Sequence, residues 1–291
     1  MMMKFYYEAI SGPLRFLKSC LLASFALGCL LSIGAVVLGY PVVSLGVVCA
    51  FVSALLVLSV LLQLRASAKL NDLHYELSLH ENLRAKRYRI EDLYFDGAAA
   101  NPSLMLLLWK CLHMCRPQSV LELGSGQTTK LLGLYYRDNP AVEILTLEHD
   151  GRWVETLRQA ITHDGRCHDY HHAPLQPASF FSLGARTQIE TAWYDFDGKL
   201  VGRTFGLILV DGPNGSNQYS RGGVLEWVPQ ILADPFIVIF DDAERYGEIM
   251  TIKAFEKTLE ANNVPYVSFD VNGVTRQYVF CSPVFSFLKF T

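Results

Sequence analysis

The sequence predicts an α/β domain with a mainly parallel sheet, preceded by an α-helical transmembrane hairpin. The hairpin is indicated by residues 19–64, which contain no charged side chain. The sheet is indicated by short apolar runs that alternate with helical stretches after residue 96, because a sheet covered by helices on both faces has wholly apolar strands. Ser119–Leu123 leads into Gly124 and Gly126, the pattern of a buried strand, a tight turn and a helix N-terminus.

Composition narrows the class of protein. A chain of 291 residues holds one ordinary α/β domain and an additional segment. A net charge of -3 without a basic stripe argues against nucleic acid as a partner. The seven cysteines are scattered and form no CxxC pair, so we interpret them as reduced thiols and packing residues. Cys111 and Cys115 flank His113, for which a helical core face is favoured over a metal site.

The uncharged run fits two membrane spans, at residues 19–38 and 42–62, joined by a short turn at Gly39-Tyr40-Pro41. Each span has the roughly 20 apolar residues that a bilayer core requires. Basic residues flank both outer ends, namely Lys4, Arg15 and Lys18 before the first span and Arg65 and Lys69 after the second. The positive-inside rule therefore places both termini and the following domain in the cytoplasm, on a multi-pass protein of the cytoplasmic (inner) membrane. A cleaved signal peptide is the weaker alternative, because the second span would remain.

The predicted domain boundaries follow from this pattern. Residues 1–18 form a cytoplasmic N-terminus, 19–64 the membrane hairpin, 65–95 a stalk helix and 96–291 the catalytic domain. In the stalk, Lys86, Arg87 and Arg89 face either anionic headgroups or solvent.

The elements of the domain follow in order. Asn101-Pro102-Ser103 predicts a helix start, and Leu104–Cys115 continues it. Further strands are predicted at 142–147, 167–172, 205–210 and 236–240, and further helices at 129–136, 151–161, 222–232 and 247–261. Residues 176–202 are expected to be an irregular insertion. At the end of the chain, residues 266–271 and 274–281 flank Asn272-Gly273, which predicts an antiparallel hairpin with a type I′ turn.

At this point the chain resembles a known family. The run Val120–Thr129, with a following strand that ends in Glu148, resembles motifs one and two of class I S-adenosylmethionine (SAM)-dependent methyltransferases. The terminal hairpin matches as well, since that Rossmann-like fold is a seven-stranded sheet whose last strand runs antiparallel. The resemblance covers roughly residues 96–283. Ile208–Pro213 and Ile239–Arg245 resemble a bacterial subgroup with an acidic end to the fifth strand.

The resemblance implies a set of cofactor-binding residues. Gly124, Ser125, Gly126 and Thr128 would surround the methionine portion and ribose, with Glu122 near the ammonium group. Glu148 would accept both ribose hydroxyls, a task that suits a carboxylate. His149, His172 and Ala173 would lie near the adenine, although the acidic residue often found after the third strand is missing. For Glu122 and Glu148 the alternative is a solvated strand end, and for His168, His171 and His172 exposed loop histidines are favoured over metal ligands.

A nicotinamide enzyme fits less well. A dinucleotide-binding turn has the pattern G-x-G-x-x-G, whereas the third position here is Thr129.

Catalysis is assigned to acidic residues after two later strands. Asp211, Asp241 and Asp242 follow apolar strands, so they meet at the carboxyl edge of the sheet. Three converging carboxylates repel one another unless a hard divalent cation such as Mg²⁺ neutralises them. The three positions resemble the metal ligands of cation-dependent O-methyltransferases related to catechol O-methyltransferase. That family has a lysine base where this chain has Asn214, so either the metal alone activates the acceptor hydroxyl, or Asp211 or Asp242 acts as general base.

Other side chains are interpreted as substrate contacts or as structural groups. Residues 214–221 form a glycine- and amide-rich loop that suits a lid. Arg221 and Arg245 would bind an acidic group of the substrate, or Arg245 would pair with Asp242 or Glu244. Trp193 and Tyr194 would stack on a sugar ring or cap the sheet edge.

The resulting hypothesis is a membrane-anchored SAM-dependent methyltransferase that acts on an oxygen of a membrane-associated acceptor, such as a lipid-linked sugar, a glycan or a lipid. The alternatives are an aminopropyltransferase-like enzyme on the same fold and a non-catalytic SAM-binding membrane scaffold. The sequence leaves open the acceptor, O- versus N-methylation, metal dependence, the oligomeric state (a homo-oligomer included) and the role of the insertion.

Overall fold

The structure is a computed structural model, and it describes residues 41–88, 100–162, 167–183, 186–213 and 219–290, together with 37, 39 and 93. The predicted cytoplasmic N-terminus, nearly all of the first predicted span and Asn214 lie outside the described residues. The chain divides into two compact units, Met1–Leu70 and Asn71–Thr291.

One long helix, α3 (Pro41–Ala85), covers the second predicted span and continues into the predicted stalk. Gly39 before it has a φ of 76°, and Pro41 stands at its first position, where its missing N–H costs no hydrogen bond. Within the described part of the chain, Val48–Ala85 is the one helix long and apolar enough to cross a membrane, and its most apolar stretch is exposed.

The last part of α3 belongs to the second unit. Leu79 and Leu83 are fully buried in a core that also contains Leu104 and Leu108 of α4 (Pro102–Lys110). Leu73 and Leu77 of α3 are exposed. Residues 71–85, which lie within the predicted stalk helix, therefore pack against the domain.

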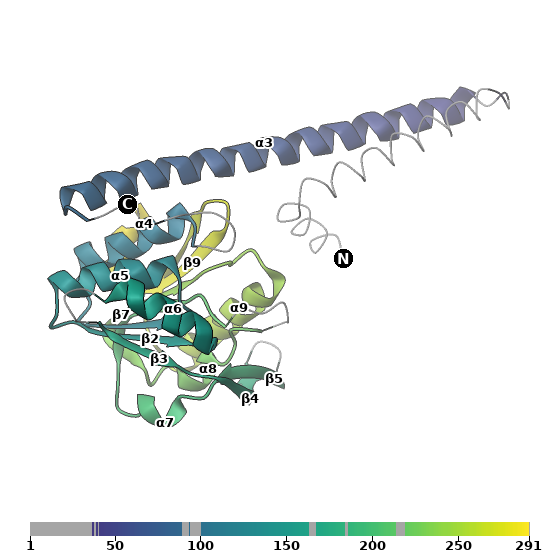
Figure 1. Cartoon of the computed structure of the whole chain (residues 1–291). Helices are drawn as coiled ribbons and strands as arrows, with labels where there is room; N and C mark the ends of the chain where they lie inside the picture. The colour runs from purple at the N-terminus through teal and green to yellow at the C-terminus, as the bar shows by residue number, and fades with distance from the viewer. Residues whose placement is uncertain are drawn as a thin grey trace. The chain divides into compact units, whose positions relative to one another are not determined.

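The sheet of the second unit has seven strands in the order β3-β2-β1-β6-β7-β9-β8 (Figure 1). The strands are β1 (Ser119–Leu123), β2 (Glu143–Glu148), β3 (Asp169–His172), β6 (Phe205–Val210), β7 (Leu232–Phe240), β8 (Val267–Asn272) and β9 (Arg276–Cys281). The last strand, β9, runs antiparallel to both of its neighbours, and the other pairs are parallel. The predicted seven-stranded sheet with an antiparallel last strand is confirmed.

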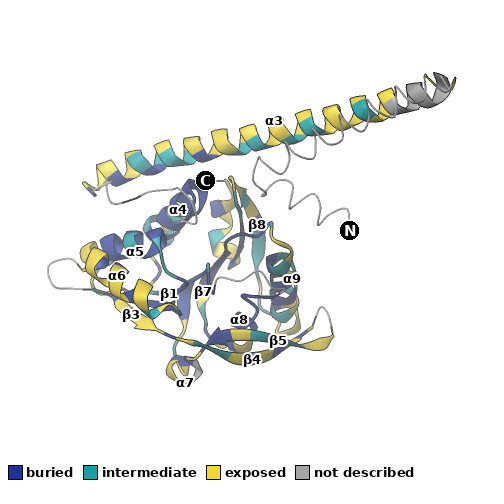
Figure 2. Ribbon diagram, turned by 45° about the vertical axis from the view of Figure 1, so that its right-hand side comes forward, coloured by how far each residue is buried: buried dark blue, intermediate teal, exposed yellow. Residues whose placement is uncertain are grey.

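Helices bury both faces of this sheet, as the strand composition predicted (Figure 2). Successive residues of β1 point to opposite faces, so Val120 lies in one core and Leu121 in the other. The first core includes residues of α4 and α5 (Gln127–Asp138), and the second includes residues of α8 (Val224–Trp227) and α9 (Tyr246–Ala261). The outer strand β3 is covered by α6 (Gly151–Ile161).

Two predicted elements are wrong. The insertion contains a regular antiparallel hairpin, β4 (Leu175–Ser182) and β5 (Thr187–Tyr194), followed by the short helix α7 (Asp197–Leu200). Burial alternates along both strands, and the buried Phe180 packs beside Tyr219. The amino-acid types alternate less clearly, because threonine, serine and alanine occupy several positions of the two strands. The helix expected at 222–232 is only α8, since Pro229 cannot continue a helix and Leu232 already begins β7.

The terminal hairpin also differs from its prediction. Asn272 pairs with Arg276, so three residues, not two, connect the strands, and neither Asn272 nor Gly273 has a positive φ. Asp72 of α3 reaches this turn, where its Oδ2 accepts a hydrogen bond from the Val274 N–H at 2.9 Å. A Cβ on Gly273 would lie 2.1 Å from Asp72 Oδ1, so the glycine serves close packing and not a type I′ turn.

Candidate active site

A cavity of about 300 Å³ opens at the carboxyl ends of β1, β2, β6 and β7. It is lined by Ala100, Asn101, Gly124, Ser125, Glu148, His149, Asp211, Gly212, Arg221, Asp241, Asp242, Arg245 and Thr275. The glycine turn and the acidic residues, predicted separately from the sequence, thus share one cavity.

The two glycines of the turn have different roles. Gly124 has a φ of 86°, and a Cβ there would lie 2.8 Å from the backbone nitrogen of Gly212. Gly126 has a φ of 178°, which any residue adopts, and its missing Cβ would meet nothing within 4 Å. Gly124 therefore serves the turn itself, whereas Gly126 leaves open space at the N-terminus of α5.

Glu122 is linked to the glycine turn through Thr129 and does not line the cavity. It is fully buried, and its Oε2 accepts hydrogen bonds from the hydroxyls of Thr129 (2.9 Å) and Thr146 (2.7 Å). Thr129 in turn accepts a hydrogen bond from the Gly126 N–H at 2.8 Å. Burial raises the pKa of Glu122 to about 7, although the neighbouring threonine hydroxyls favour its charged form.

Glu148 is held ionised at the wall of the cavity. Its Oε2 accepts hydrogen bonds from the Ser125 N–H (2.9 Å) and hydroxyl (2.8 Å), and its Oε1 accepts one from the Asp150 N–H (2.9 Å). His149 Nδ1 lies 2.8 Å from Glu148 Oε1. Burial would raise the pKa of Glu148, but these partners outweigh it and hold the pKa at about 2. The glutamate correspondingly raises the pKa of His149.

Five predicted cofactor residues are not among those that line the cavity, namely Glu122, Gly126, Thr128, His172 and Ala173. Thr128 and Ala173 are buried, and Ala173 donates its N–H to the Glu148 carbonyl at 2.8 Å. His172 is exposed, with Nε2 3.1 Å from the His149 carbonyl.

His168 is not an exposed loop histidine. It is buried beside Thr146, whose hydroxyl lies 3.1 Å from its Nε2, and burial lowers its pKa to about 4.

The acidic residues form one cluster. Ligand oxygens of Asp211, Asp241 and Asp242 lie within 4.8 Å of one another. Burial and the charge of Asp241 raise the pKa of Asp211 well above its usual value, and burial and Asp242 raise the pKa of Asp241 to about 6. About a quarter of the Asp211 side chain stays exposed, so it is the most accessible carboxyl of the three.

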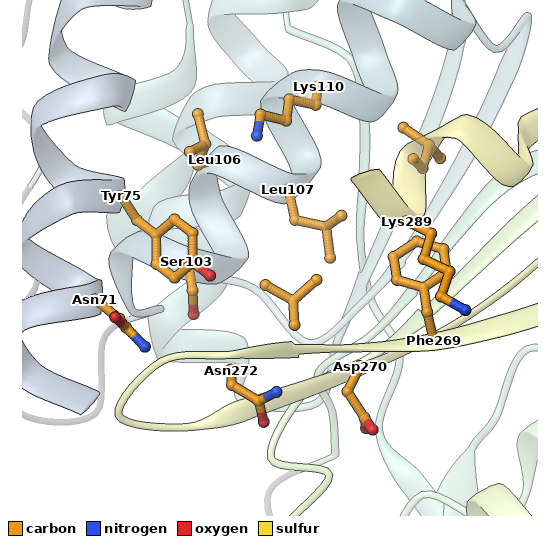
Figure 3. Close-up of a pocket in the computed structure, with 12 residues that line it drawn as sticks. Asn71, Tyr75, Ser103, Leu106, Leu107, Lys110, Phe269, Asp270, Asn272 and Lys289 are labelled. Carbon is orange, nitrogen blue, oxygen red and sulfur yellow. The ribbon is translucent and has the colours of Figure 1, made fainter. Parts of the chain in front are cut away.

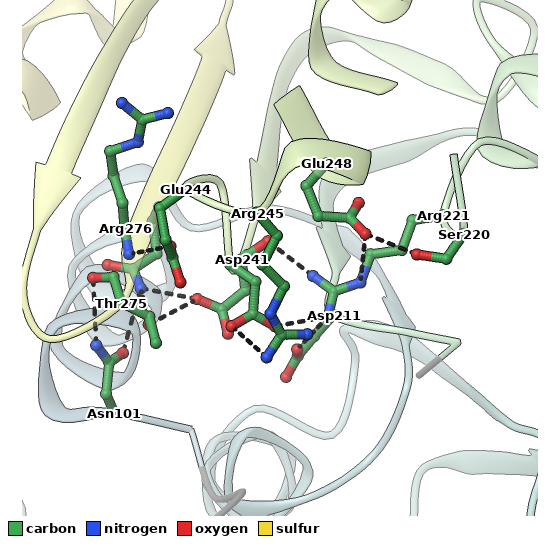
Figure 4. Close-up of polar contacts among 12 residues, drawn as sticks. Asn101, Asp211, Ser220, Arg221, Asp241, Glu244, Arg245, Glu248, Thr275 and Arg276 are labelled. Atoms are coloured by element: carbon green, nitrogen blue, oxygen red, sulfur yellow. Dashed lines mark hydrogen bonds and ion pairs between the residues drawn. The ribbon is translucent and has the colours of Figure 1, made fainter. Parts of the chain in front are cut away.

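Arg221 is the internal counter-charge of this cluster (Figure 4). Its side chain is 3% exposed, and Nη2 lies 2.9 Å from Asp242 Oδ2 and 3.3 Å from Asp211 Oδ1. Its Nη1 donates to the Asp241 carbonyl at 2.7 Å. Arg221 was expected to bind an acidic substrate, but all of these contacts are internal. Arg245, by contrast, is about half exposed and pairs with Asp242 Oδ1 at 2.9 Å.

Sequence reasoning missed the polar residues behind Asp241. The buried Gln277 of β9 donates from Nε2 to Asp241 Oδ1 at 2.7 Å and to Asn101 Oδ1 at 3.2 Å. Asn101 was recognised only as the helix cap, which it is, since its Oδ1 accepts from the Leu104 N–H at 3.2 Å. No local pattern marks Gln277, because its partners lie far away along the chain.

Trp193 and Tyr194 are both buried, so neither is available to stack on a ligand. Trp193 packs on Trp227, and the Tyr194 hydroxyl lies beneath Gly212.

No protein-family model and no curated protein sequence matches the chain. Solved structures with a similar fold include the O-methyltransferase from Bacillus cereus in complex with SAH, at 12% identity over 72% of this chain and 91% of that chain, with a TM-score of 0.44. They also include the O-methyltransferase TomG from Streptomyces achromogenes in complex with SAM, at 13% identity over 72% of this chain and 89% of that chain, with a TM-score of 0.44. At this distance we take the function from the residues of the site itself.

Proposed function

We propose that this protein is a membrane-anchored SAM-dependent methyltransferase that transfers a methyl group to an oxygen of a membrane-associated acceptor, such as a lipid-linked sugar, a glycan or a lipid. One observation carries the proposal: the glycine turn with Glu148 and the cluster of Asp211, Asp241 and Asp242 line the same cavity. A donor site and a proton-accepting site within one cavity are what methyl transfer requires.

The donor would bind at the glycine turn. Glu148, ionised at any physiological pH, would accept the ribose hydroxyls and exchange part of its contacts with Ser125 for them. The open space beside Gly126 admits the ligand close to the backbone, at the positive end of α5.

The acceptor would bind against the carboxylates. Asp211 is accessible, and its raised pKa makes its carboxylate a stronger base than an ordinary aspartate, as a general base requires. It would take the proton of the acceptor hydroxyl while the oxygen bonds to the methyl carbon. In the same step the carbon–sulfur bond would break, and its electron pair would leave the donor as a neutral thioether.

A divalent cation fits the same residues. Asp211, Asp241 and Asp242 offer hard oxygen ligands within 4.8 Å of one another, which suits Mg²⁺ in chemistry and spacing. Such an ion would polarise the acceptor oxygen and lower the pKa of its hydroxyl. Arg221 and Arg245 supply two positive charges against the three aspartates and the neighbouring Glu248, so more carboxylates than cations surround the site.

The donor proposal is tested by titration calorimetry of the full chain in detergent. We expect binding of SAM and SAH, and weaker binding of decarboxylated SAM. Stronger binding of decarboxylated SAM would favour aminopropyl transfer, and the absence of binding by all three would exclude the enzyme proposal.

The acceptor proposal is tested with methyl-labelled SAM and a membrane lipid extract. We expect Asp211→Asn to abolish incorporation of label while SAM affinity is retained, whereas the control Asp195→Asn, at an exposed site, keeps activity. Activity of Asp211→Asn equal to that of the wild type would refute this assignment. Full activity in EDTA would exclude a role for a divalent cation.

We propose that both termini and the catalytic domain face the cytoplasm. A reporter fused after Thr291 is expected to be active only on the cytoplasmic side.

A further inference from the structure

A second cavity, of about 290 Å³, lies between the last part of α3, α4, β8 and the C-terminal 3₁₀ helix η2 (Pro283–Phe290) (Figure 3). None of its lining residues lines the active-site cavity. Its walls are apolar where Leu106, Leu107, Phe269, Val271 and Leu288 contribute. Such a cavity accepts the apolar part of a ligand.

Two lysines line this cavity without a counter-ion. Within the described part of the chain, neither Lys110 nor Lys289 forms an ion pair. Lys110 is half-buried, and burial lowers its pKa, which shows the cost of holding this charge without an anion. The acidic side chain of the lining, Asp270, pairs with Arg276 at 3.6 Å. The cavity therefore combines apolar walls with two unneutralised positive charges, the complement of an anionic amphiphile.

The adjoining helix η2 exposes an apolar surface. Leu288 points inward and is 3% exposed, whereas Val284 is 64% exposed and Phe290 84%. Phe287 is also exposed, and Lys289 lies between these aromatic residues. Exposed aromatic residues interleaved with lysine are typical of segments that lie at a membrane interface.

The cavity is also close along the chain to the predicted membrane span. Asn71 lines the cavity, and Leu64, the last residue before the first charge, is seven positions earlier in the sequence. Seven residues can span at most about 25 Å, so the chain keeps the cavity within reach of the surface of a bilayer that holds the span.

We propose that this cavity and η2 form a membrane-contact face that binds the anionic headgroup of a bilayer phospholipid. Lys110 and Lys289 bind the phosphate, and Phe287 and Phe290 enter the apolar part of the bilayer. The unneutralised lysines select an anionic lipid over a zwitterionic one. The proposal depends on membrane attachment but not on methyl transfer, so a catalytically inactive chain would still show it.

The first test is native mass spectrometry of the full chain in neutral detergent, titrated with phosphatidylglycerol or phosphatidylcholine. We expect phosphatidylglycerol to be retained preferentially, and the double variant Lys110→Gln/Lys289→Gln to bind it about thirtyfold more weakly. The matched control Lys199→Gln/Lys253→Gln removes two exposed lysines of α7 and α9 and should bind like the wild type. Equal retention by both double variants, or equal retention of the two lipids, overturns the proposal. Complete displacement by millimolar inorganic phosphate would assign the lysines to a free anion and also overturns it.

The second test addresses the aromatic residues. A benzophenone amino acid at position 290 of the full chain, reconstituted in phosphatidylglycerol-containing nanodiscs, should crosslink to lipid on irradiation. The same group at position 253 on α9 should not. Crosslinking from position 290 to a copurifying protein, or no lipid adduct at all, counts against a membrane-contact face.

Discussion

Two parts of the candidate active-site cavity, the proposed donor end at Glu148 and the proposed acceptor end at Asp211, differ in how their carboxylates hold protons. At the donor end, Glu148 is bound by Ser125 and Asp150 and keeps its charge, with a pKa of about 2. At the acceptor end, partial burial and the neighbouring carboxylates raise the pKa values of Asp211 and Asp241. The donor end therefore presents a fixed negative charge to a ligand, whereas the acceptor end can gain and lose protons.

The two ends also differ in where their partners come from. Glu148 is satisfied mainly by its own turn and the turn after β1. The acceptor end depends on Arg221, which precedes α8, and on Gln277 near the end of the chain. We therefore expect the donor end to be disturbed by changes within its own turns, and the acceptor end by removal of one distant partner.

The largest effect is expected from Arg221→Met. The substitution removes the buried cation beside Asp211, Asp242 and Glu248, and should lower the free energy of unfolding by about 3–5 kcal/mol. Arg245→Gln removes the half-exposed partner of Asp242 and should cost less than about 1 kcal/mol. Urea unfolding of the full chain in detergent, followed by tryptophan fluorescence, measures both, since all four tryptophans lie after residue 100. Similar losses in the two variants would contradict the role of Arg221 as internal counter-charge.

The glycine turn offers a matched pair. Gly124→Ala places a Cβ at positive φ against the Gly212 backbone and should cost about 3 kcal/mol of stability. Gly126→Ala adds its Cβ to open space, so we expect unchanged unfolding but SAM binding weakened at least tenfold by calorimetry. Normal SAM affinity in Gly126→Ala would show that the ligand does not approach this side of the turn.

The pH dependence of stability should have opposite signs at the two ends. The pKa of Asp241 rises on folding to about 6, so its contribution is full below about pH 4 and is lost as the pH rises through 6. The pKa of Glu148 falls to about 2, so its contribution is present above about pH 4 and is lost as the pH falls toward 2.

Urea unfolding at several pH values tests this pair. Between pH 4 and 7, the free energy of unfolding of the wild type should fall by about 2 kcal/mol relative to that of Asp241→Asn. Relative to Glu148→Gln, the wild type should lose stability below pH 4. If the free energy of unfolding of the wild type and of either variant changed in parallel with pH, the residue replaced in that variant would not contribute to the pH dependence.

The smallest effect is expected at the turn that supports the acceptor end. Asp72→Ala leaves the Val274 N–H without its acceptor and should cost about 1 kcal/mol, with faster hydrogen exchange at Val274. The control Asp270→Asn, on the exposed side of β8, should change stability by less than about 0.5 kcal/mol. Unchanged exchange at Val274 in Asp72→Ala would show that α3 does not hold this turn.

The sequence by itself determined the sheet, the turn after β1 and the acidic strand ends. Apolar strands, helical periodicity and turn glycines are local patterns, so Gly124, Glu148 and Asp211 could be assigned to one edge without coordinates. Only the tertiary structure decided that Glu122 lies beneath the turn, that Arg221 and Gln277 hold the carboxylates, and that Asp72 reshapes the terminal hairpin. Apart from the Thr129 contact of Glu122, these contacts join segments distant along the chain, and a buried polar group takes whichever partner packing brings within reach, which no local pattern encodes.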